Sequence, residues 1–388
     1  MKSSGPGSEI EELCSSLAAA GYTVKFSGYS ALDLYFRLPS LPFLWIETNA
    51  DIAVLARYID NMRFPGVDIA DAAVETSGST CYFRCLESGE RSKTCFPILS
   101  LTYDWLTKRF QDPLGIYPLL RELRDHKLET VHNLNLVQPR IENHRIAMEA
   151  ALLLARYGFS AEAFAAATAQ ELPRPEAQRA FLSCLMLSAR PEEGLELLKK
   201  SDFLKEFWPE LAYLNEVDHS KEFHPEGNVW NHTLETFRYR KPAASGAFDL
   251  RLSLALLLHD TGKPISASFG NHRFDGHAEL GALAAARFME RLEFEPSLIQ
   301  DIYYLVRNHM LPAALKRLPL VKTKEIMASP LFPTLLELYR CDESSSFKGL
   351  NDFYENTAAY QAYLKNIKNP YRSKDGKKIR SLAEKYKI

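Results

Sequence analysis

The sequence of 388 residues lacks any long apolar run. No stretch approaches the ~20 apolar residues that a membrane-spanning helix needs. The first residues, MKSSGPGSEIEEL, also lack the apolar core of a secretory signal. These absences predict a cytoplasmic protein that makes no contact with a membrane.

The sequence also has few cysteines and a net charge close to zero. The six cysteines are scattered, and the one close pair, Cys81 and Cys85, has no second pair at the spacing of a zinc site. We therefore expect reduced thiols, as in a cytosol. The formal net charge of -2 exerts no general attraction on nucleic acid, so any RNA contact must come from local patches.

The length exceeds the ~250–300 residues at which single cores stop growing, which indicates several domains. Residues 22–110 mix short β-prone runs such as YTVKFSG and CYFRCLE with helix-like segments, typical of an α+β domain with a small sheet. From about residue 114, Ala, Leu, Glu and Arg recur with helical periodicity. We predict a mainly helical chain: an α+β head (1–113), an all-α neck (114–215), a second all-α domain (216–365) and a basic tail (366–388). The tail is expected to be flexible or to dock elsewhere, with RNA contact as the alternative.

Histidine, in contrast, is concentrated in one segment. Seven of the ten histidines fall between residues 219 and 309: His219, His224, His232, His259, His272, His277 and His309. A single histidine is usually a surface residue or a satisfied core residue. Clustering on this scale favours a shared chemical role instead.

The stretch LALLLHDTGKP (254–264) places His259 and Asp260 at the end of an apolar helix. Burying such a pair costs several kcal/mol unless something neutralises it, and a divalent cation does so well. Imidazole nitrogen and carboxylate oxygen suit Mn, Fe, Co, Ni or Zn, and carboxylate also suits Mg. His277, His309 and Asp342 also lie in or beside helical segments, so a helical bundle could gather these groups around metal ions.

The order His232, His259-Asp260, Asp342 resembles the signature of the HD superfamily of metal-dependent phosphohydrolases, and HDTGKP matches its H-D-x-G-K element. The resemblance implies one or two divalent ions (Mn, Fe, Ni, Co, Zn or Mg). His232, His259, Asp260 and Asp342 would bind the first ion, and His277 and His309 the second, with Asp260 bridging.

The same resemblance implies catalytic roles for Asp260 and Lys263, because Lys263 would contact a substrate phosphate as a point charge. The alternative for Lys263 is a solvated lysine that stabilises a helix end. His224, in HPEG, is either a group on the substrate side or a turn residue.

FHPEGNVWNHTLETF and LALLLHDTGKP look most like the HD domain appended to bacterial CCA-adding enzymes, in the tRNA nucleotidyltransferase/poly(A) polymerase family. That family's G-G-x-V-R-D element falls on SGYSAL, which keeps only Gly28. Its D-x-D-I-x-T-N-A element falls on FLWIETNA, so Phe43 and Trp45 take the places of two metal-binding aspartates, and Cys95 takes that of a third carboxylate. Aromatic rings cannot coordinate Mg. The family's nucleotide-selecting pair falls on Glu176 and Ala177.

Three functions follow as hypotheses. The preferred one is a metal-dependent phosphohydrolase acting on a nucleotide or RNA-end phosphate, such as a tRNA 3′ end, through a metal-bound hydroxide, with an inactive polymerase head. The first alternative is a tRNA nucleotidyltransferase that adds CCA or A. The second is a non-catalytic RNA-binding scaffold. The apolar helices after residue 310 leave room for a homodimer. Natural substrate, metal identity and oligomeric state stay open.

Overall fold

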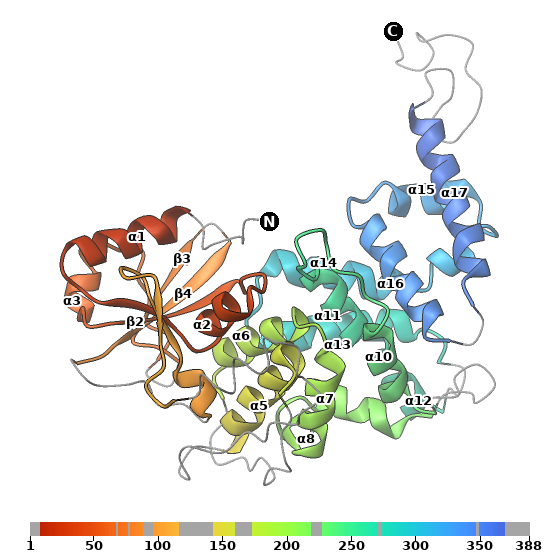
Figure 1. The fold of residues 1–388 in the computed structure, drawn as a ribbon. Helices are drawn as coiled ribbons and strands as arrows, with labels where there is room; N and C mark the ends of the chain where they lie inside the picture. Colours follow the sequence, from red (N-terminus) through yellow and green to blue (C-terminus); the bar gives the residue numbers. More distant parts are fainter. Residues whose placement is uncertain are drawn as a thin grey trace. The chain divides into compact units, whose positions relative to one another are not determined.

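The computed structural model describes residues 8–66, 69–76, 78–87, 96–115, 143–159, 173–218, 227–270, 274–346 and 349–368 (Figure 1). The chain forms two compact units. The first comprises Met1–Phe207 and Pro242–Phe248, and the second comprises Trp208–Lys241 and Asp249–Ile388. In the described residues, no helix combines the length and the apolarity that crossing a membrane requires.

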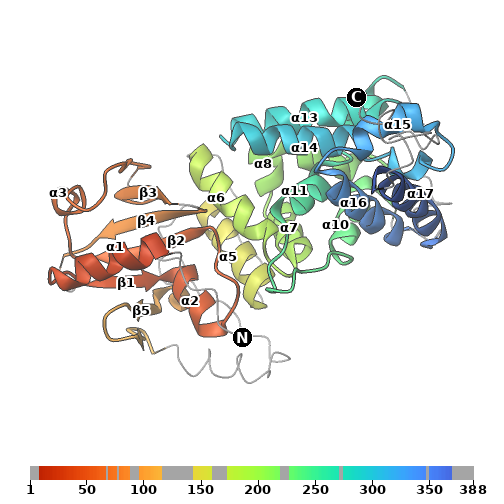
Figure 2. The same ribbon diagram turned by 90° about the horizontal axis from the view of Figure 1, so that it is seen from above.

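The first unit contains a mixed six-stranded sheet with the order β3-β4-β2-β1-β5-β6 (Figure 2). Strand β2 pairs with β4 in parallel, and the other pairings are antiparallel. The strands are β1 (Val24–Ser27), β2 (Phe43–Thr48), β3 (Ala72–Thr76), β4 (Ser79–Cys85), β5 (Thr102–Asp104) and β6 (Arg109–Gln111). The helices of this unit are α1 (Ser8–Ala19), α2 (Gly28–Phe36), α3 (Ile52–Leu55), the 3-10 helix η1 (Pro97–Ser100), α5 (Asn143–Tyr157), α6 (Pro175–Met186), α7 (Pro191–Lys200) and α8 (Phe203–Phe207).

Alternation along β2 decides which side chains the sheet buries on each face. Leu44 and Ile46 belong to the core shared with Leu17 of α1. Phe43 and Trp45 point to the opposite face, where both rings pack on Tyr82 of β4 at centroid distances of 6.2 and 6.0 Å. The head therefore has a second, aromatic layer on the face away from α1.

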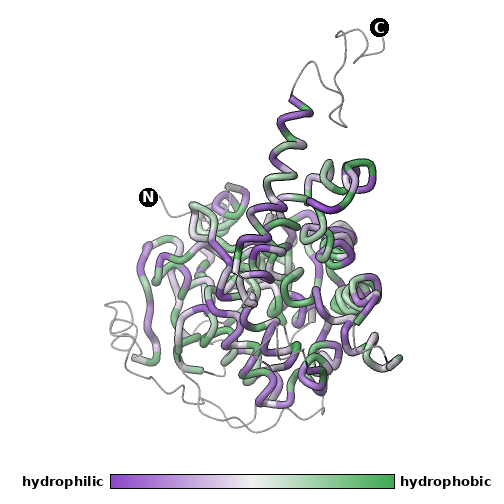
Figure 3. The backbone as a smooth tube through the Cα atoms, turned by 90° about the vertical axis from the view of Figure 1, so that its right-hand side faces the viewer, coloured by the Kyte–Doolittle hydropathy of each residue, from purple (hydrophilic) through white to green (hydrophobic). Residues whose placement is uncertain are grey.

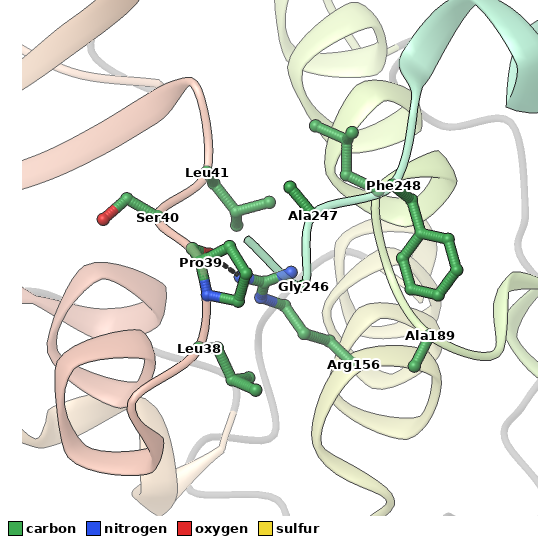
Figure 4. A pocket seen from close by; sticks show the side chains of 10 residues that line it. Leu38, Pro39, Ser40, Leu41, Arg156, Ala189, Gly246, Ala247 and Phe248 are labelled. Carbon is green, nitrogen blue, oxygen red and sulfur yellow. Dashed lines mark hydrogen bonds between the residues drawn. The ribbon is translucent and has the colours of Figure 1, made fainter. Parts of the chain in front are cut away.

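A buried ion pair joins α2 to α5. Arg156 donates from Nε and Nη2 to the two carboxylate oxygens of Asp33 (2.7 and 2.8 Å) and from Nη2 to the carbonyl of Pro39 (2.6 Å). The guanidinium lines a pocket of about 440 Å³, part of it open to solvent, together with Leu41 and with Gly246 and Phe248 from the segment 242–248 (Figure 4). The close-up shows Arg156 reaching toward Pro39 across this pocket.

Among the described residues of the second unit, all the named elements are helices. Its helices are α9 (Pro209–Ala212), η2 (Tyr213–Glu216), α10 (Val229–Phe237), α11 (Leu250–Leu258), α12 (Gly262–Ser268), α13 (His277–Arg291), α14 (Pro296–Asn308), η3 (Pro312–Ala314), α15 (Leu320–Met327), α16 (Phe332–Ser344) and α17 (Asn351–Lys368). Along the described chain, hydrophilic and hydrophobic residues follow one another in short stretches (Figure 3). On α14, for example, the buried residues are Ile299, Ile302, Leu305 and Val306, one face of a helix. The predicted fold class, an α+β head with a small sheet followed by helices, is confirmed.

Candidate metal centre

Helix α11 explains why His259 and Asp260 are buried. Every residue from Leu252 to Leu258 is buried, as expected of a helix that is apolar on all sides and runs through the middle of a unit. The Asp249 carboxylate caps its start by accepting from the N–H groups of Arg251 and Leu252. The chain therefore delivers the His259-Asp260 pair directly into the core, where both residues are 1% exposed.

Gly262 allows the next helix to approach the site. A Cβ at this position would lie 2.0 Å from the carbonyl oxygen of His277 and 2.5 Å from the nitrogen of Gly281. Because glycine has no Cβ, the start of α12 can lie directly against the first turn of α13. This contact places His277, the first residue of α13, beside Asp260. The glycine of the HDTGKP motif is thus required for packing.

Five of the predicted ligands converge in two groups that share Asp260: His232 with His259 and Asp260, and Asp260 with His277 and His309. Within each group the candidate ligand atoms lie within 4.8 Å of one another. Oxygen Oδ2 of Asp260 lies 3.2 Å from Nε2 of His259 and 4.0 Å from Nε2 of His232. Oxygen Oδ1 lies 3.6 Å from Nε2 of His277 and 4.0 Å from Nε2 of His309. Each carboxylate oxygen therefore faces one pair of histidines.

Asp342 approaches the first group from α16. Its Oδ1 lies 2.9 Å from Nε2 of His232, which is a member of that group. Lys263 is buried rather than solvated, and its ammonium donates to Oδ2 of Asp260 at 2.6 Å. Of the remaining clustered histidines, His219, His224 and His272 lie outside the described residues.

The Nδ1 atoms of three histidines contact main-chain carbonyls three residues earlier. His259 contacts Leu256 O at 2.8 Å, His277 contacts Phe274 O at 2.8 Å, and His309 contacts Val306 O at 2.6 Å. A carbonyl only accepts, so each Nδ1 carries a proton. In the neutral imidazole the lone pair is then on Nε2, the atom that points into the site.

This arrangement fits a cation. Nε2 of His277 and Nε2 of His309 lie 3.1 Å apart, so two lone pairs face each other in a buried site unless a positive charge lies between them. Nε2 of His259 is buried and makes no hydrogen bond among the described residues. Metal–ligand bonds of about 2.0–2.2 Å put two neighbouring ligands of one ion roughly 3–3.5 Å apart, close to several of the separations found.

Burial and neighbouring charges shift the pKa values of the cluster. Desolvation lowers the pKa of His309 to about 4 and also lowers the pKa of His277. Although burial opposes it, the neighbouring His259 and Lys263 hold the pKa of Asp260 well below its ordinary value, and His232 does the same for Asp342. At neutral pH the site therefore presents ionised carboxylates and, on α13 and α14, neutral imidazoles, the states that ligate metals.

Acidification is expected to destabilise the metal-free protein. Unfolded histidine takes up a proton below pH ~6.5, whereas folded His309 stays neutral down to about pH 4. Between these values the unfolded state binds more protons, so the free energy of unfolding falls as the pH falls. Urea midpoints at pH 7.5, 6 and 5 measure this effect. His309→Gln should show a weaker pH dependence, and identical slopes for both proteins would contradict the assignment.

In the head, the structure places Phe43 and Trp45 side by side on one face of β2. Among the described residues, neither group of candidate ligand atoms includes a residue of the head. Cys95 lies outside the described residues. Glu176 accepts hydrogen bonds from Arg63 and, at 3.0 Å, from the hydroxyl of Tyr82.

Sequence reasoning missed the buried carboxylate Asp33, which accepts from Arg156 and, at 2.7 Å, from the Tyr157 hydroxyl. The available signal was an aspartate flanked by apolar residues in SALDLYF, since a buried charge needs a partner.

His and Asp side chains from five helical segments converge in a candidate metal centre, and residues 229–334 match the family model described as HD domain. The chain therefore carries an HD domain, as the sequence predicted. A CC-adding tRNA nucleotidyltransferase of Thermus thermophilus is 30% identical over 272 residues, which cover 65% of this chain and 60% of that protein. A multifunctional CCA protein of Halorhodospira halophila is 34% identical over 126 residues, 32% of this chain and 29% of that protein.

The chain thus spans less than two thirds of the length of these curated relatives. Among solved structures, the Bacillus stearothermophilus CCA-adding enzyme in complex with CTP is 12% identical, with a TM-score of 0.49, and the match covers 92% of this chain and 82% of that one. The predicted resemblance, an HD domain on a tRNA nucleotidyltransferase-like scaffold, is confirmed.

The expected main function is wrong. The sequence analysis preferred a phosphohydrolase with an inactive polymerase head, but the curated relatives carry the names of CCA-adding and CC-adding proteins. The comparisons favour the alternative, a tRNA nucleotidyltransferase. The error came from treating Phe43 and Trp45 as proof of lost activity, although replacing two side chains does not by itself show that the head is inactive.

Proposed function

We propose that this chain is an enzyme that acts on the 3′ end of tRNA in the manner of a tRNA nucleotidyltransferase, and that its HD domain holds divalent cations. Its partners are then a tRNA and a nucleoside triphosphate. The cytoplasmic location and the homodimer stay predictions.

The observation that carries the proposal is the extent of the similarity to the CC-adding enzyme. The match covers 65% of this chain, whereas the segment from residue 229 to the end makes up only about 41% of its 388 residues. Even if that whole segment were aligned, the match must also include residues before the HD domain, and these make up about a quarter of the whole chain. The similarity therefore includes part of the head or neck, where a transferase works, and is more than a shared HD domain.

The head raises a chemical requirement. Nucleotidyl transfer uses carboxylate oxygens to hold Mg, and Phe43 and Trp45 offer none. Strand alternation puts Glu47 on the same face of β2 as these two rings, in register with Lys25 of β1 and Arg84 of β4. Glu47 is thus the acidic side chain that β2 itself places on that face.

A direct assay tests the transferase. The protein is incubated with Mg, labelled CTP or ATP and a tRNA that lacks its 3′ CCA. We expect incorporation into this tRNA and none into a tRNA whose CCA end is complete. Loss of incorporation in Glu47→Gln, with tRNA binding retained, would locate the replacement ligand. No incorporation when the protein is stoichiometric with tRNA would refute the proposal.

For the HD domain we propose two cation sites. His232, His259, Asp260 and Asp342 hold the first, and Asp260, His277 and His309 hold the second, with Asp260 bridging. The pairing of the ligand atoms around the two oxygens of Asp260 supports this division. Four imidazoles favour Mn, Fe, Co, Ni or Zn over Mg. Bound there, such ions supply positive charge and an acidified water. Lys263, held by Asp260, is the candidate contact for a substrate phosphate.

A further inference from the structure

His232 differs from the other three histidines in the partner that its Nδ1 faces. His259 and His309 follow the last residues of α11 and α14, and His277 is the first residue of α13. At a helix end, main-chain carbonyls are free to accept from a side chain. His232 instead lies in the middle of α10, where the helix uses its own carbonyls, and the carbonyl of Val229, three residues earlier, also accepts from the Thr233 hydroxyl at 2.9 Å.

The partner that Nδ1 of His232 faces comes from a different helix. It is the hydroxyl of Ser345, the C-cap residue of α16, at 3.3 Å. The same hydroxyl lies 2.6 Å from the main-chain carbonyl of Asp342. A serine hydroxyl has one proton, and the carbonyl can only accept it. The oxygen of Ser345 is then left to accept from Nδ1–H of His232.

We infer that Ser345 is a positioning residue, which fixes the tautomer of His232 so that Nε2 presents its lone pair to the first cation. Because Ser345 holds the proton on Nδ1, Nε2 is the ring nitrogen that gives up its proton when His232 binds an ion together with Asp342, whose Oδ1 is 2.9 Å away. The hydroxyl is buried at the end of the helix that carries Asp342. It therefore orients the ring of His232 and contacts the main chain of Asp342 at the same time. The inference rests on the proposed metal centre.

The consequence is an asymmetry between the two sites. In the second site, main-chain carbonyls fix the tautomers of His277 and His309, and no side-chain substitution removes a carbonyl. In the first site, a main-chain carbonyl fixes the tautomer of His259 in the same way. Only His232 depends on a replaceable hydroxyl. Loss of Ser345 should therefore weaken the first site and spare the second.

Titration calorimetry of the metal-free full-length protein with Zn²⁺ tests this asymmetry. In Ser345→Ala we expect the affinity of one site to fall about 10- to 100-fold, the usual effect of losing a partner that orients a ligand, with the other site unchanged. Ser345→Thr keeps the hydroxyl and should restore binding. The matched control is Ser346→Ala, because that hydroxyl donates to Glu343 O at 2.8 Å and serves the helix end alone.

Nitrogen NMR of the histidine rings gives a second readout that does not depend on activity and that already tests the wild type by itself. Wild-type His232 should show a protonated Nδ1, and Ser345→Ala should lose this preference. A wild type that binds no Zn²⁺ would refute the metal centre. Equal binding by wild type and Ser345→Ala would refute the role of Ser345 alone, and so would a wild-type His232 with an unprotonated Nδ1, even if the variant fails to fold.

Discussion

Replacing Asp260 by alanine is expected to empty both cation sites, from two ions per chain to none. Asp260 belongs to both ligand groups, and each of its oxygens faces a different pair of histidines. Removing it takes away the only negative charge that the two groups share. The remaining buried imidazoles would then have to hold divalent ions without a bridging anion, which a low-dielectric site disfavours. Elemental analysis of the purified protein, after incubation with Mn or Zn and removal of free metal, measures the content.

Two further variants, Asp260→Asn and Asp301→Ala, separate loss of the ligand from loss of stability. Alanine at position 260 also leaves Lys263 without its carboxylate partner in a buried site, which costs stability. Asp260→Asn keeps the size of the side chain and should lose the ions just as Ala does. Asp301→Ala removes an aspartate of the same domain that pairs with Arg251 at the surface, and it should keep both ions. Retention of metal by both Asp260 variants would show that the cluster is not the metal site.

The sequence indicated the cluster of candidate ligands around Asp260 because its evidence is local. A histidine beside an aspartate at the end of an unbroken apolar helix, followed by a glycine, specifies burial, charge and close packing in a few residues, and the structure has all three at His259, Asp260 and Gly262. The tautomers of the histidines could not be predicted from the sequence, because they depend on which carbonyl or hydroxyl lies beside each ring. Ser345 is 113 residues from His232 along the chain, and no spacing rule connects them.

The head shows the opposite case. Its small sheet was predicted from short β-prone runs, but its function was misjudged from substituted motif positions. Phe43 and Trp45 are integral to an aromatic layer with Tyr82, so their identity is also a matter of packing. A substitution that fits a packing role says little about chemistry until the surrounding carboxylates have been tested. The ion pair between Asp33 and Arg156, separated by 123 residues, had no signal beyond an acid in an apolar helix.

That ion pair leads to the second large effect. Arg156→Ala is expected to destabilise the first unit by about 3–5 kcal/mol, because it leaves the carboxylate of Asp33 buried without its cation. Both side chains are only 5% exposed. Burial already raises the pKa of Asp33, and the two N–H groups of Arg156 and the hydroxyl of Tyr157 oppose that shift. Without Arg156, the hydroxyl of Tyr157 and the main-chain N–H of Leu41 remain to compensate the charge.

Urea unfolding followed by tryptophan fluorescence measures the loss, with Trp45 and Trp105 reporting on the first unit and Trp208 and Trp230 on the second. The matched control is Arg145→Ala on the same helix, whose partner Glu149 is one turn away and whose side chain is 38% exposed, so that it should cost less than about 1 kcal/mol. Adding Asp33→Asn to Arg156→Ala removes the uncompensated charge and should recover part of the loss. Metal binding by the HD domain should not change. If Arg156→Ala costs no more than Arg145→Ala, the buried pair does not hold α2 against α5, and the apolar contacts between these helices suffice.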